Sequence, residues 1–304
     1  MGLETLANKV ILITGASTGI GGYTAKFLSK FKPKVAIVAR STEKLKEVQK
    51  QCEEAGAGKG NVLPITADMA KQEDLSKVID ETVKAFGQID TLVNNAAAFA
   101  INDIETTKPE TFNRIIAVNL RAPFFLSQLA MPHLKKTKGS IVNISSVAAH
   151  RAVVDVAAYC ISKAALEHFT RVLALEIASA GVRANAIVVG GTMTDTQSES
   201  LQLLGNEVMY ELSDLKKIQP LGGTCSMEDV AKVIGFLSSD LSCAMTGTSI
   251  PVDRGSLVVP PAQPEAVSEQ LSAMKNMGDF NPVATQLRLE QIGSMAKGAK
   301  PRAP

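Results

Sequence analysis

The chain has 304 residues, 45% of them hydrophobic and 20% charged, a balance typical of a globular protein. Its 32 basic and 30 acidic residues leave a net charge of +2, which argues against nucleic acid or an anionic membrane as a partner. Residues 1–8 carry no apolar leader and no segment has the length of a membrane span, so we expect a cytoplasmic protein with no membrane span. The four cysteines form no C-x-x-C pair, which favours free thiols and no metal site.

Short apolar runs alternate with longer helical patterns along the chain. In order, the expected elements are strand 10–14, helix 20–30, strand 35–39, helix 43–54, strand 62–65, helix 73–86, strand 89–93, helix 111–134, strand 140–145, helix 157–178, strand 183–188, helix 227–237 and strand 249–252. The strand runs are continuously apolar, as in Val10-Ile11-Leu12-Ile13, which indicates strands covered on both sides. The sequence therefore predicts an α/β fold, a Rossmann-type doubly wound parallel sheet of about seven strands with helices on both faces.

The domain organisation changes after Gly255. No repeat or linker interrupts the pattern before it, so we predict a single dinucleotide-binding and catalytic domain over residues 1–255. Pro260, Pro261 and Pro264 then break the pattern, and residues 256–304 are predicted to form a C-terminal extension, partly helical or disordered. A small apolar stripe in this extension is a candidate to dock across a neighbouring subunit.

A glycine-rich turn follows the first expected strand. Glycines allow a tight turn and bring backbone N–H groups close to a pyrophosphate, which the positive end of the following helix also favours. Such a stretch alone is more often an ordinary turn, but its place directly after the first buried strand favours a dinucleotide cofactor. The predicted contacts in this turn, which reads T-G-A-S-T-G-I-G from position 14, are Gly15, Ser17, Thr18, Gly19, Ile20 and Gly21.

The end of the second strand points to the choice between cofactors. NAD-dependent enzymes usually place a carboxylate here on the adenosine ribose, whereas an arginine accommodates a 2′-phosphate. This chain has Arg40 after Ala39, with Ser41 and Lys44 within reach, so we predict NADP(H) in preference to NAD(H). The alternative is that Arg40 is an ordinary solvated residue at a strand end.

The candidate chemical group is formed by Ser146, Tyr159 and Lys163. Tyr159 and Lys163 are four residues apart and share one helix face, and an adjacent ammonium favours the phenolate. In the reducing direction a neutral Tyr159 donates a proton to a carbonyl oxygen while the Ser146 hydroxyl steadies the oxyanion. Asn119 is a candidate to hold a water that links Lys163 to solvent. Tyr-x-x-x-Lys alone is common by chance, as an exposed helical pair, and only the surrounding motifs favour the catalytic interpretation.

These motifs together resemble the short-chain dehydrogenase/reductase family, in its branch of compact subunits, over residues 8–255. The matching pieces are the T-G-x-x-x-G-x-G turn, Asp68, Asn94-Asn95-Ala96, Asn119, Ser146, Tyr159-x-x-x-Lys163 and Asp253. The resemblance implies catalytic roles for Asn119, Ser146, Tyr159 and Lys163. It also implies that Asp68 contacts adenine, that Asn94 and Ala96 lie along the nucleotide, and that Lys163 binds the nicotinamide ribose. The other cofactor positions assigned in this way are Met69, Asn95, Tyr159, Gly190 and Thr192.

Three positions depart from the family pattern. Ala97 replaces a usual glycine, which costs little unless φ is positive there. Val189 replaces a proline after the sixth strand, so we expect a more flexible turn beside the nicotinamide pocket. Arg254 replaces a glycine and is expected to face a neighbouring subunit or the C-terminal extension.

Substrate choice is expected in residues 192–219, a segment rich in leucine, methionine and valine. We predict a mobile lid over an apolar pocket, with ordinary core packing as the equally weighted alternative. The long helices at 111–134 and 157–178 resemble the family's oligomerising pair, which predicts a homotetramer, or else a dimer. The sequence thus predicts an NADP(H)-dependent oxidoreductase acting on a small-molecule, hydrophobic ketone, aldehyde or alcohol. The alternative is a nucleotide-binding sensor or scaffold that kept the fold and lost turnover.

Overall fold

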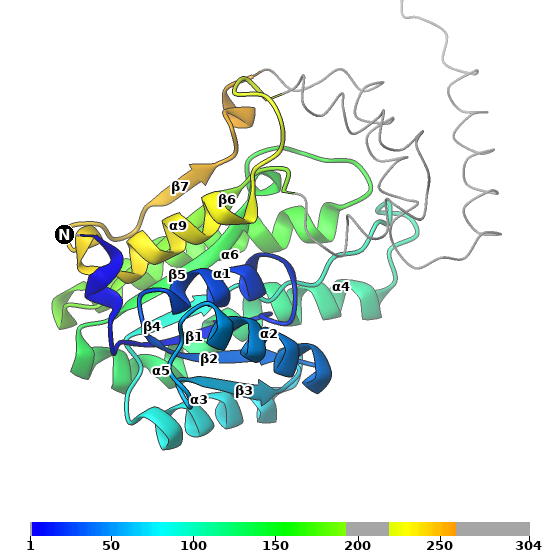
Figure 1. Ribbon diagram of the computed structural model, residues 1–304. Helices are drawn as coiled ribbons and strands as arrows, with labels where there is room; N and C mark the ends of the chain where they lie inside the picture. The colour runs from blue at the N-terminus through cyan, green and yellow to red at the C-terminus, as the bar shows by residue number, and fades with distance from the viewer. Residues whose placement is uncertain (1, 193–218, 260–304) are drawn as a thin grey trace, which may run out of the picture.

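The computed structural model describes residues 2–192 and 219–259 (Figure 1). The predicted lid, apart from its ends at Thr192 and Gln219, lies outside the described residues. So does the predicted C-terminal extension beyond Val259.

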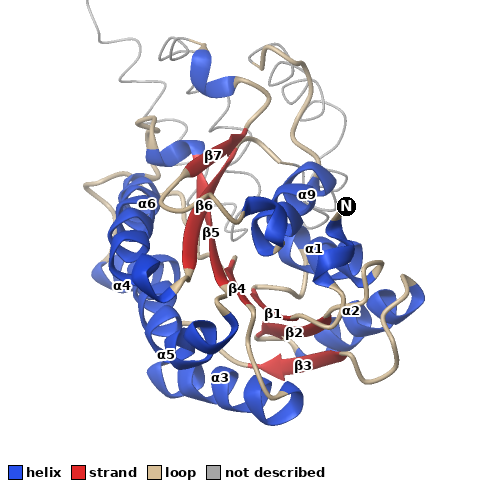
Figure 2. Ribbon diagram, turned by 90° about the vertical axis from the view of Figure 1, so that its left-hand side faces the viewer, coloured by secondary structure: helices blue, strands red, loops and turns tan. Residues whose placement is uncertain are grey.

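Seven parallel strands form one sheet in the order β3-β2-β1-β4-β5-β6-β7, which confirms the predicted doubly wound fold (Figure 2). The strand order changes direction between β1 and β4. The connections that leave the carboxyl ends of these two strands therefore run to opposite faces of the sheet, and a crevice lies between them. The strands are β1 (Val10–Thr14), β2 (Lys34–Ala39), β3 (Val62–Thr66), β4 (Thr91–Asn94), β5 (Ser140–Ser146), β6 (Arg183–Val189) and β7 (Ser249–Val252).

Helices cover both faces of the sheet, as Figure 2 shows. One face carries α1 (Gly19–Ser29), α2 (Thr42–Glu54) and α9 (Met227–Ser238), with the 3-10 helix η1 (Leu3–Leu6) beside α9. The other face carries α3 (Gln72–Phe86), α4 (Pro109–Ile116), α5 (Ala122–Thr137) and α6 (Ala157–Ile177). The remaining short turns are η3 (Val147–Ala149), η4 (Ala178–Ala180), η5 (Asp240–Ser242) and η6 (Ser256–Val258).

Strand β1 shows why the apolar runs are continuous. Its five residues are all buried, and successive side chains point to opposite faces. Leu12 belongs to the core under α3, α5 and α6, whereas Ile11 and Ile13 belong to the core under α1, α2 and α9. Both faces of the sheet therefore require apolar residues, which removes the polar alternation of a half-exposed strand.

The helix expected at 111–134 differs most from its prediction. It begins at Pro109, in the first turn where proline is tolerated, and it ends at Thr137, where Lys138 takes a left-handed conformation with φ of 50°. Between α4 and α5 the residues Ala117–Arg121 form a π-helical turn, η2. A π turn inserts one extra residue without changing the amphipathic pattern greatly, so periodicity did not indicate it.

The helical run from Pro109 to Thr137 is long and apolar enough to cross a membrane by composition alone. However, 50% of its most apolar window is buried inside the protein. In the fold it packs against α3, α6 and the strands β4 and β5. These contacts explain its hydrophobicity as that of a core helix.

Candidate active site

The glycine turn joins β1 to α1 at the crevice. Gly15 and Gly19 have φ values of 67° and 58°, in the left-handed region that favours glycine. A Cβ on Gly21 would lie 2.5 Å from both the Asn95 amide nitrogen and the Gly15 carbonyl oxygen, so this position accepts no side chain. Thr18 is the N-cap of α1, and its side chain makes no capping hydrogen bond. The first N–H groups of α1 are thus available, which fits the phosphates of a dinucleotide.

The other residues assigned to this part of the site mostly hold the turn in place. The Asn95 amide donates to the carbonyls of Thr14 and Gly15, at 2.8 and 3.1 Å. The Asn94 side chain is buried and donates to Asn143 at 2.8 Å, so it does not face the crevice. The Met69 side chain is also buried, in the core under α3. These three residues therefore act on a nucleotide only through their backbone or by positioning the turn.

Arg40 lies at the end of β2, exposed to solvent. Within residues 2–192 and 219–259, no hydrogen bond or ion pair engages its guanidinium. Ser41 caps α2 by accepting from the Lys44 N–H at 3.3 Å, and its hydroxyl donates to the Glu43 carboxylate at 3.2 Å. The exposed carboxylate of Glu43 thus lies beside Ser41, one of the residues expected to contact the 2′-phosphate.

The three chemical residues meet at the carboxyl end of β5 and the start of α6. The Lys163 ammonium lies 5.6 Å from the centre of the Tyr159 ring, and the Ser146 side chain lies close enough to the Tyr159 phenol to affect its pKa. The Lys163 side chain is buried and its Nζ donates to the Ile144 carbonyl at 2.7 Å. The predicted arrangement is thus present, except that Lys163 is anchored to β5 rather than to the phenol.

Burial dominates the electrostatics of this group. It raises the pKa of Tyr159 to about 12, and the nearby Ser146 hydroxyl only partly opposes this. Burial also lowers the pKa of Lys163 to about 8. The sequence analysis expected the adjacent ammonium to favour phenolate. Instead, the desolvation of the anion is the larger effect, so Tyr159 is neutral at physiological pH and able to donate a proton.

Asn119 lies within the π turn, and its side chain is fully engaged. Its oxygen accepts from the Ala98 N–H at 2.7 Å, and its amide donates to the Ala98 carbonyl at 2.9 Å and to Ser162 at 3.0 Å. Asn119 therefore fixes the loop after β4 to α6. A water relay at this residue has to use its main chain, whose hydrogen-bonding register is shifted by the π turn.

The last strands complete the crevice. A Cβ on Gly190 would lie 2.7 Å from the Asp253 Cα, so glycine is needed where β6 passes the turn after β7. Val189 pairs in register with Ser146 on β5 and with Val252 on β7, and it is buried. Up to this residue β6 is a regular strand, and the flexibility expected of the turn that follows it stays a prediction. Thr192 donates to the Gly190 carbonyl at 3.1 Å.

The two other departures have simple explanations. Ala97 is not among the described residues with positive φ, so alanine is tolerated there. Arg254 donates to the Gly222 carbonyl at 2.9 Å and lies 3.6 Å from the Asp229 carboxylate. It therefore joins the turn before α9 to the end of β7, and its expected position facing another subunit or the extension stays a prediction.

The structure adds residues that the sequence analysis missed. Phe99 packs edge-on against the Tyr159 ring, with centroids 5.0 Å apart, and is 47% exposed. The buried Glu167 accepts from Ser145 at 2.7 Å and pairs with His150 at 3.0 Å, so it ties both sides of Ser146 to α6. An aromatic residue in a loop and a carboxylate one turn beyond Lys163 carry no distinctive spacing, so no sequence signal indicated either.

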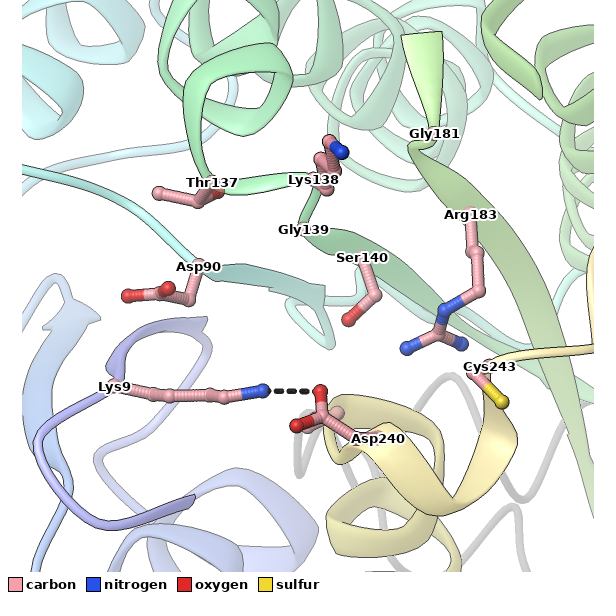
Figure 3. A pocket seen from close by; sticks show the side chains of 11 residues that line it. Lys9, Asp90, Thr137, Lys138, Gly139, Ser140, Gly181, Arg183, Asp240 and Cys243 are labelled. Atoms are coloured by element: carbon pink, nitrogen blue, oxygen red, sulfur yellow. Dashed lines mark hydrogen bonds and ion pairs between the residues drawn. The ribbon is translucent and has the colours of Figure 1, made fainter. Parts of the chain in front are cut away.

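A cavity of about 220 Å³ lies elsewhere, at the amino ends of β1, β4, β5 and β6 (Figure 3). Its wall includes Lys9, Asp90, Arg183 and Asp240, and Lys9 pairs with Asp240 at 2.6 Å. Because ligands of this fold bind at the carboxyl ends of strands, and none of the catalytic candidates lines it, we do not assign the reaction to this cavity. Among the described residues, no group of three histidine, cysteine or acidic side chains is arranged to hold a metal.

Comparisons with known proteins agree with this geometry. A family model described as enoyl-(acyl carrier protein) reductase matches residues 15–256. An uncharacterized oxidoreductase of Thermotoga maritima is 36% identical over 83% of this chain and 98% of its own length. The meso-2,3-butanediol dehydrogenase of Serratia marcescens is 33% identical over 82% of this chain and 94% of its own. A cofactor-bound structure of a short-chain dehydrogenase/reductase of unknown function from Caenorhabditis elegans shares 32% identity over 84% of this chain and 98% of its own, with a TM-score of 0.77.

The chain belongs to the short-chain dehydrogenase/reductase family. It is thus an oxidoreductase of the class that interconverts alcohols and carbonyl compounds with a nicotinamide cofactor, NAD or NADP.

The buried Lys163 predicts a particular pH dependence of stability. Its pKa is about 8 in the folded protein against an ordinary 10.5, so between these values the unfolded chain binds more protons and stability rises with pH. We expect the free energy of unfolding of the wild type, minus that of Lys163→Met, to increase by up to about 1.4 kcal/mol per pH unit from about pH 8 to pH 10. Urea unfolding across this range measures it.

The control is Lys46→Met, at an exposed position on α2, whose stability should follow that of the wild type at every pH. The window stops near pH 10 because Tyr159 changes its own contribution above that pH. A constant difference between the wild type and Lys163→Met contradicts the assignment of a depressed pKa to this lysine.

Proposed function

We propose that this protein is an NADP(H)-dependent reductase or dehydrogenase of hydrophobic ketones, aldehydes or secondary alcohols, with Tyr159 as its acid/base. The observation that carries the proposal is the buried Lys163 ammonium 5.6 Å from the centre of the Tyr159 ring, at the end of the strand that carries Ser146. When bound, the cofactor supplies or accepts the hydride. We assign the remaining roles to side chains of this chain.

Each of these side chains has a defined role when the substrate is reduced. Tyr159 is protonated because burial raises its pKa to about 12, and its hydroxyl transfers a proton to the substrate oxygen. The Ser146 hydroxyl donates a hydrogen bond to the same oxygen while negative charge develops on it. The Lys163 ammonium binds the ribose next to the reacting ring and stabilises the phenolate that proton transfer leaves on Tyr159.

The apolar nature of the substrate is inferred from the rim of the site. Phe99 contacts Tyr159 and remains half-exposed. Ile104 and Val154 are 81% and 58% exposed and belong to two loops joined by the bridge between Asn102 and Val156. Exposed apolar side chains beside a catalytic group favour an apolar ligand.

The decisive assay follows the loss of NADPH or NADH with a panel of lipophilic and small polar carbonyl compounds. We expect turnover with NADPH and higher kcat/KM for the lipophilic members. Tyr159→Phe should reduce kcat by about a hundredfold or more while NADPH still binds, because only the proton donor is lost.

Tyr23→Phe is the matched control, because Tyr23 lies on α1 and interacts with Glu228, far from Ser146 in the site. It should leave kcat unchanged. If the wild type binds NADPH tightly but reduces no carbonyl, the chain is a nucleotide sensor or scaffold instead, as in the alternative drawn from the sequence. Better kcat/KM for small polar carbonyls contradicts the hydrophobic substrate.

The proposed preference for NADP(H) depends on Arg40. Its charged fork is the main cation at the end of β2, and a charge-assisted bond to phosphate contributes about 1.5–3 kcal/mol. We therefore expect Arg40→Ala to weaken NADPH binding by about 10- to 100-fold and NADH binding by much less. Fluorescence titration of the two reduced cofactors measures both constants. Equal losses for NADPH and NADH contradict this role.

A second copy of the chain is the proposed partner. Helix α6 carries exposed Ile161, Val172 and Leu175 along one side, and α5 carries exposed Phe124, which stacks on Phe169 of α6. Such a surface on two adjacent helices favours a symmetric interface, in a homotetramer or dimer. We expect sedimentation to show an oligomer that Leu175→Glu dissociates and Leu241→Glu, on η5, does not. A monomeric wild type contradicts the proposal.

A further inference from the structure

The loop that follows β3 is fastened by two arginines to the helical run that carries Asn119. Arg114 on α4 donates from both terminal nitrogens to the two oxygens of Asp68, at 2.9 and 3.1 Å. Arg121, in the π turn, donates to the Ala70 carbonyl at 2.6 Å. The two arginines therefore make different contacts: Arg114 pairs with a carboxylate, whereas Arg121 binds a main-chain carbonyl oxygen.

Asp68 pairs with Arg114 and follows Ala67, whose N–H donates to the carbonyl of Ala39, the residue before Arg40. Burial alone would raise the pKa of its carboxyl group, but hydrogen bonds from Arg114 and the Ala70 N–H, with the charges of Arg114 and Arg40, hold that pKa below its ordinary value. Asp68 is thus a carboxylate, and Arg40 is close enough to feel its charge. Of these two arginines, Arg114 is the one hydrogen-bonded to it, in the bidentate geometry that guanidinium and carboxylate groups favour.

This arrangement affects how much positive charge remains for a ligand. Arg40 makes no hydrogen bond or ion pair with another described residue, so its guanidinium group is available to bind a ligand. Without Arg114, Asp68 would be an uncompensated carboxylate near Arg40. It would attract the Arg40 guanidinium and repel a 2′-phosphate placed there.

We propose that Arg114 is a specificity-determining residue that acts without touching the cofactor: by neutralising Asp68, it leaves Arg40 free to bind the 2′-phosphate of NADP(H). The inference rests on the proposed function, because it concerns the cofactor choice of the same site. It adds that the choice depends on three charges, Arg40, Asp68 and Arg114, rather than on Arg40 alone.

The test compares the dissociation constants of NADPH and NADH for purified full-length variants by fluorescence titration. Arg114→Gln keeps the length of the side chain approximately and removes its charge. We expect it to weaken NADPH binding by about tenfold and NADH binding by less than about threefold, so the NADPH preference falls. Arg114→Lys, which keeps the charge but not the fork, should retain most of the preference.

Two further variants separate charge from structure. Arg121→Gln releases the same loop from the helix but leaves Asp68 neutralised, so the NADPH preference should not change. The double variant Asp68→Asn/Arg114→Gln removes both charges and should restore the preference, even if the loss of Asp68 weakens both cofactors equally. A merely structural role of Arg114 does not produce this rescue.

The outcomes distinguish this inference from the proposed function. A wild type that binds NADH as tightly as NADPH contradicts the proposed cofactor and the role of Arg114 together. A wild type that prefers NADPH, with an unchanged preference in Arg114→Gln, overturns the inference and leaves the proposed function standing. A lowered preference that the double variant does not restore also overturns it. If Arg114→Gln does not fold, as judged by circular dichroism, Arg114→Met takes its place with the same expected loss of NADPH preference. An unchanged preference in Arg114→Met overturns the inference.

Discussion

The close approach of the glycine turn to the end of β4 is the constraint on which the site depends. A Cβ on Gly15 would lie 2.7 Å from the Ala96 Cα. The backbone segments that follow β1 and β4 are therefore in direct contact, although they lead to opposite faces of the sheet. The Thr14 hydroxyl accepts from the N–H groups of Asn95 and Ala96, each at 3.1 Å. These bonds place the start of α1 beside the loop that leads to Asn119. The position of the glycine turn relative to the proposed catalytic residues is therefore fixed.

The proposed catalytic residues are organised by burial as much as by contact. Lys163 is removed from water, and its ammonium is stabilised by the Ile144 carbonyl in place of solvent. The same environment keeps Tyr159 neutral, since an anion is more costly to bury than a phenol. The proposed function needs a proton donor that stays protonated at neutral pH, and the raised pKa of Tyr159 meets this requirement. The shift also means that phenolate formation depends on charges that arrive with the ligands.

Charge is distributed along the crevice by pairing. Asp68 is neutralised by Arg114, and the Glu167 carboxylate lies 3.0 Å from His150 Nε2, whereas Arg40 and the N-terminus of α1 keep their positive potential. Each paired carboxylate lies beside a part of the site that has to bind or stabilise negative charge. The unpaired cations thus mark where an anionic ligand is favoured.

The sequence by itself determined the alternation of strands and helices, the position of the glycine turn, and the spacing of Asn119, Ser146, Tyr159 and Lys163. These features are local or periodic: buried strands need apolar residues on both faces, and a tyrosine and a lysine four residues apart share a helix face. The family resemblance followed from the same spacings, and the comparisons confirmed it.

Only the tertiary structure decided which way each pKa shifts, because desolvation depends on what surrounds Tyr159 and Lys163 rather than on their neighbours in sequence. It also decided the partners of distant residues, such as Arg114 with Asp68 across 46 positions and Phe99 with Tyr159. The π turn at Asn119 and the regular strand through Val189 were equally inaccessible, since neither alters the pattern of apolar residues. Periodicity reports which face of an element is buried, whereas contacts between elements set the chemistry of the site.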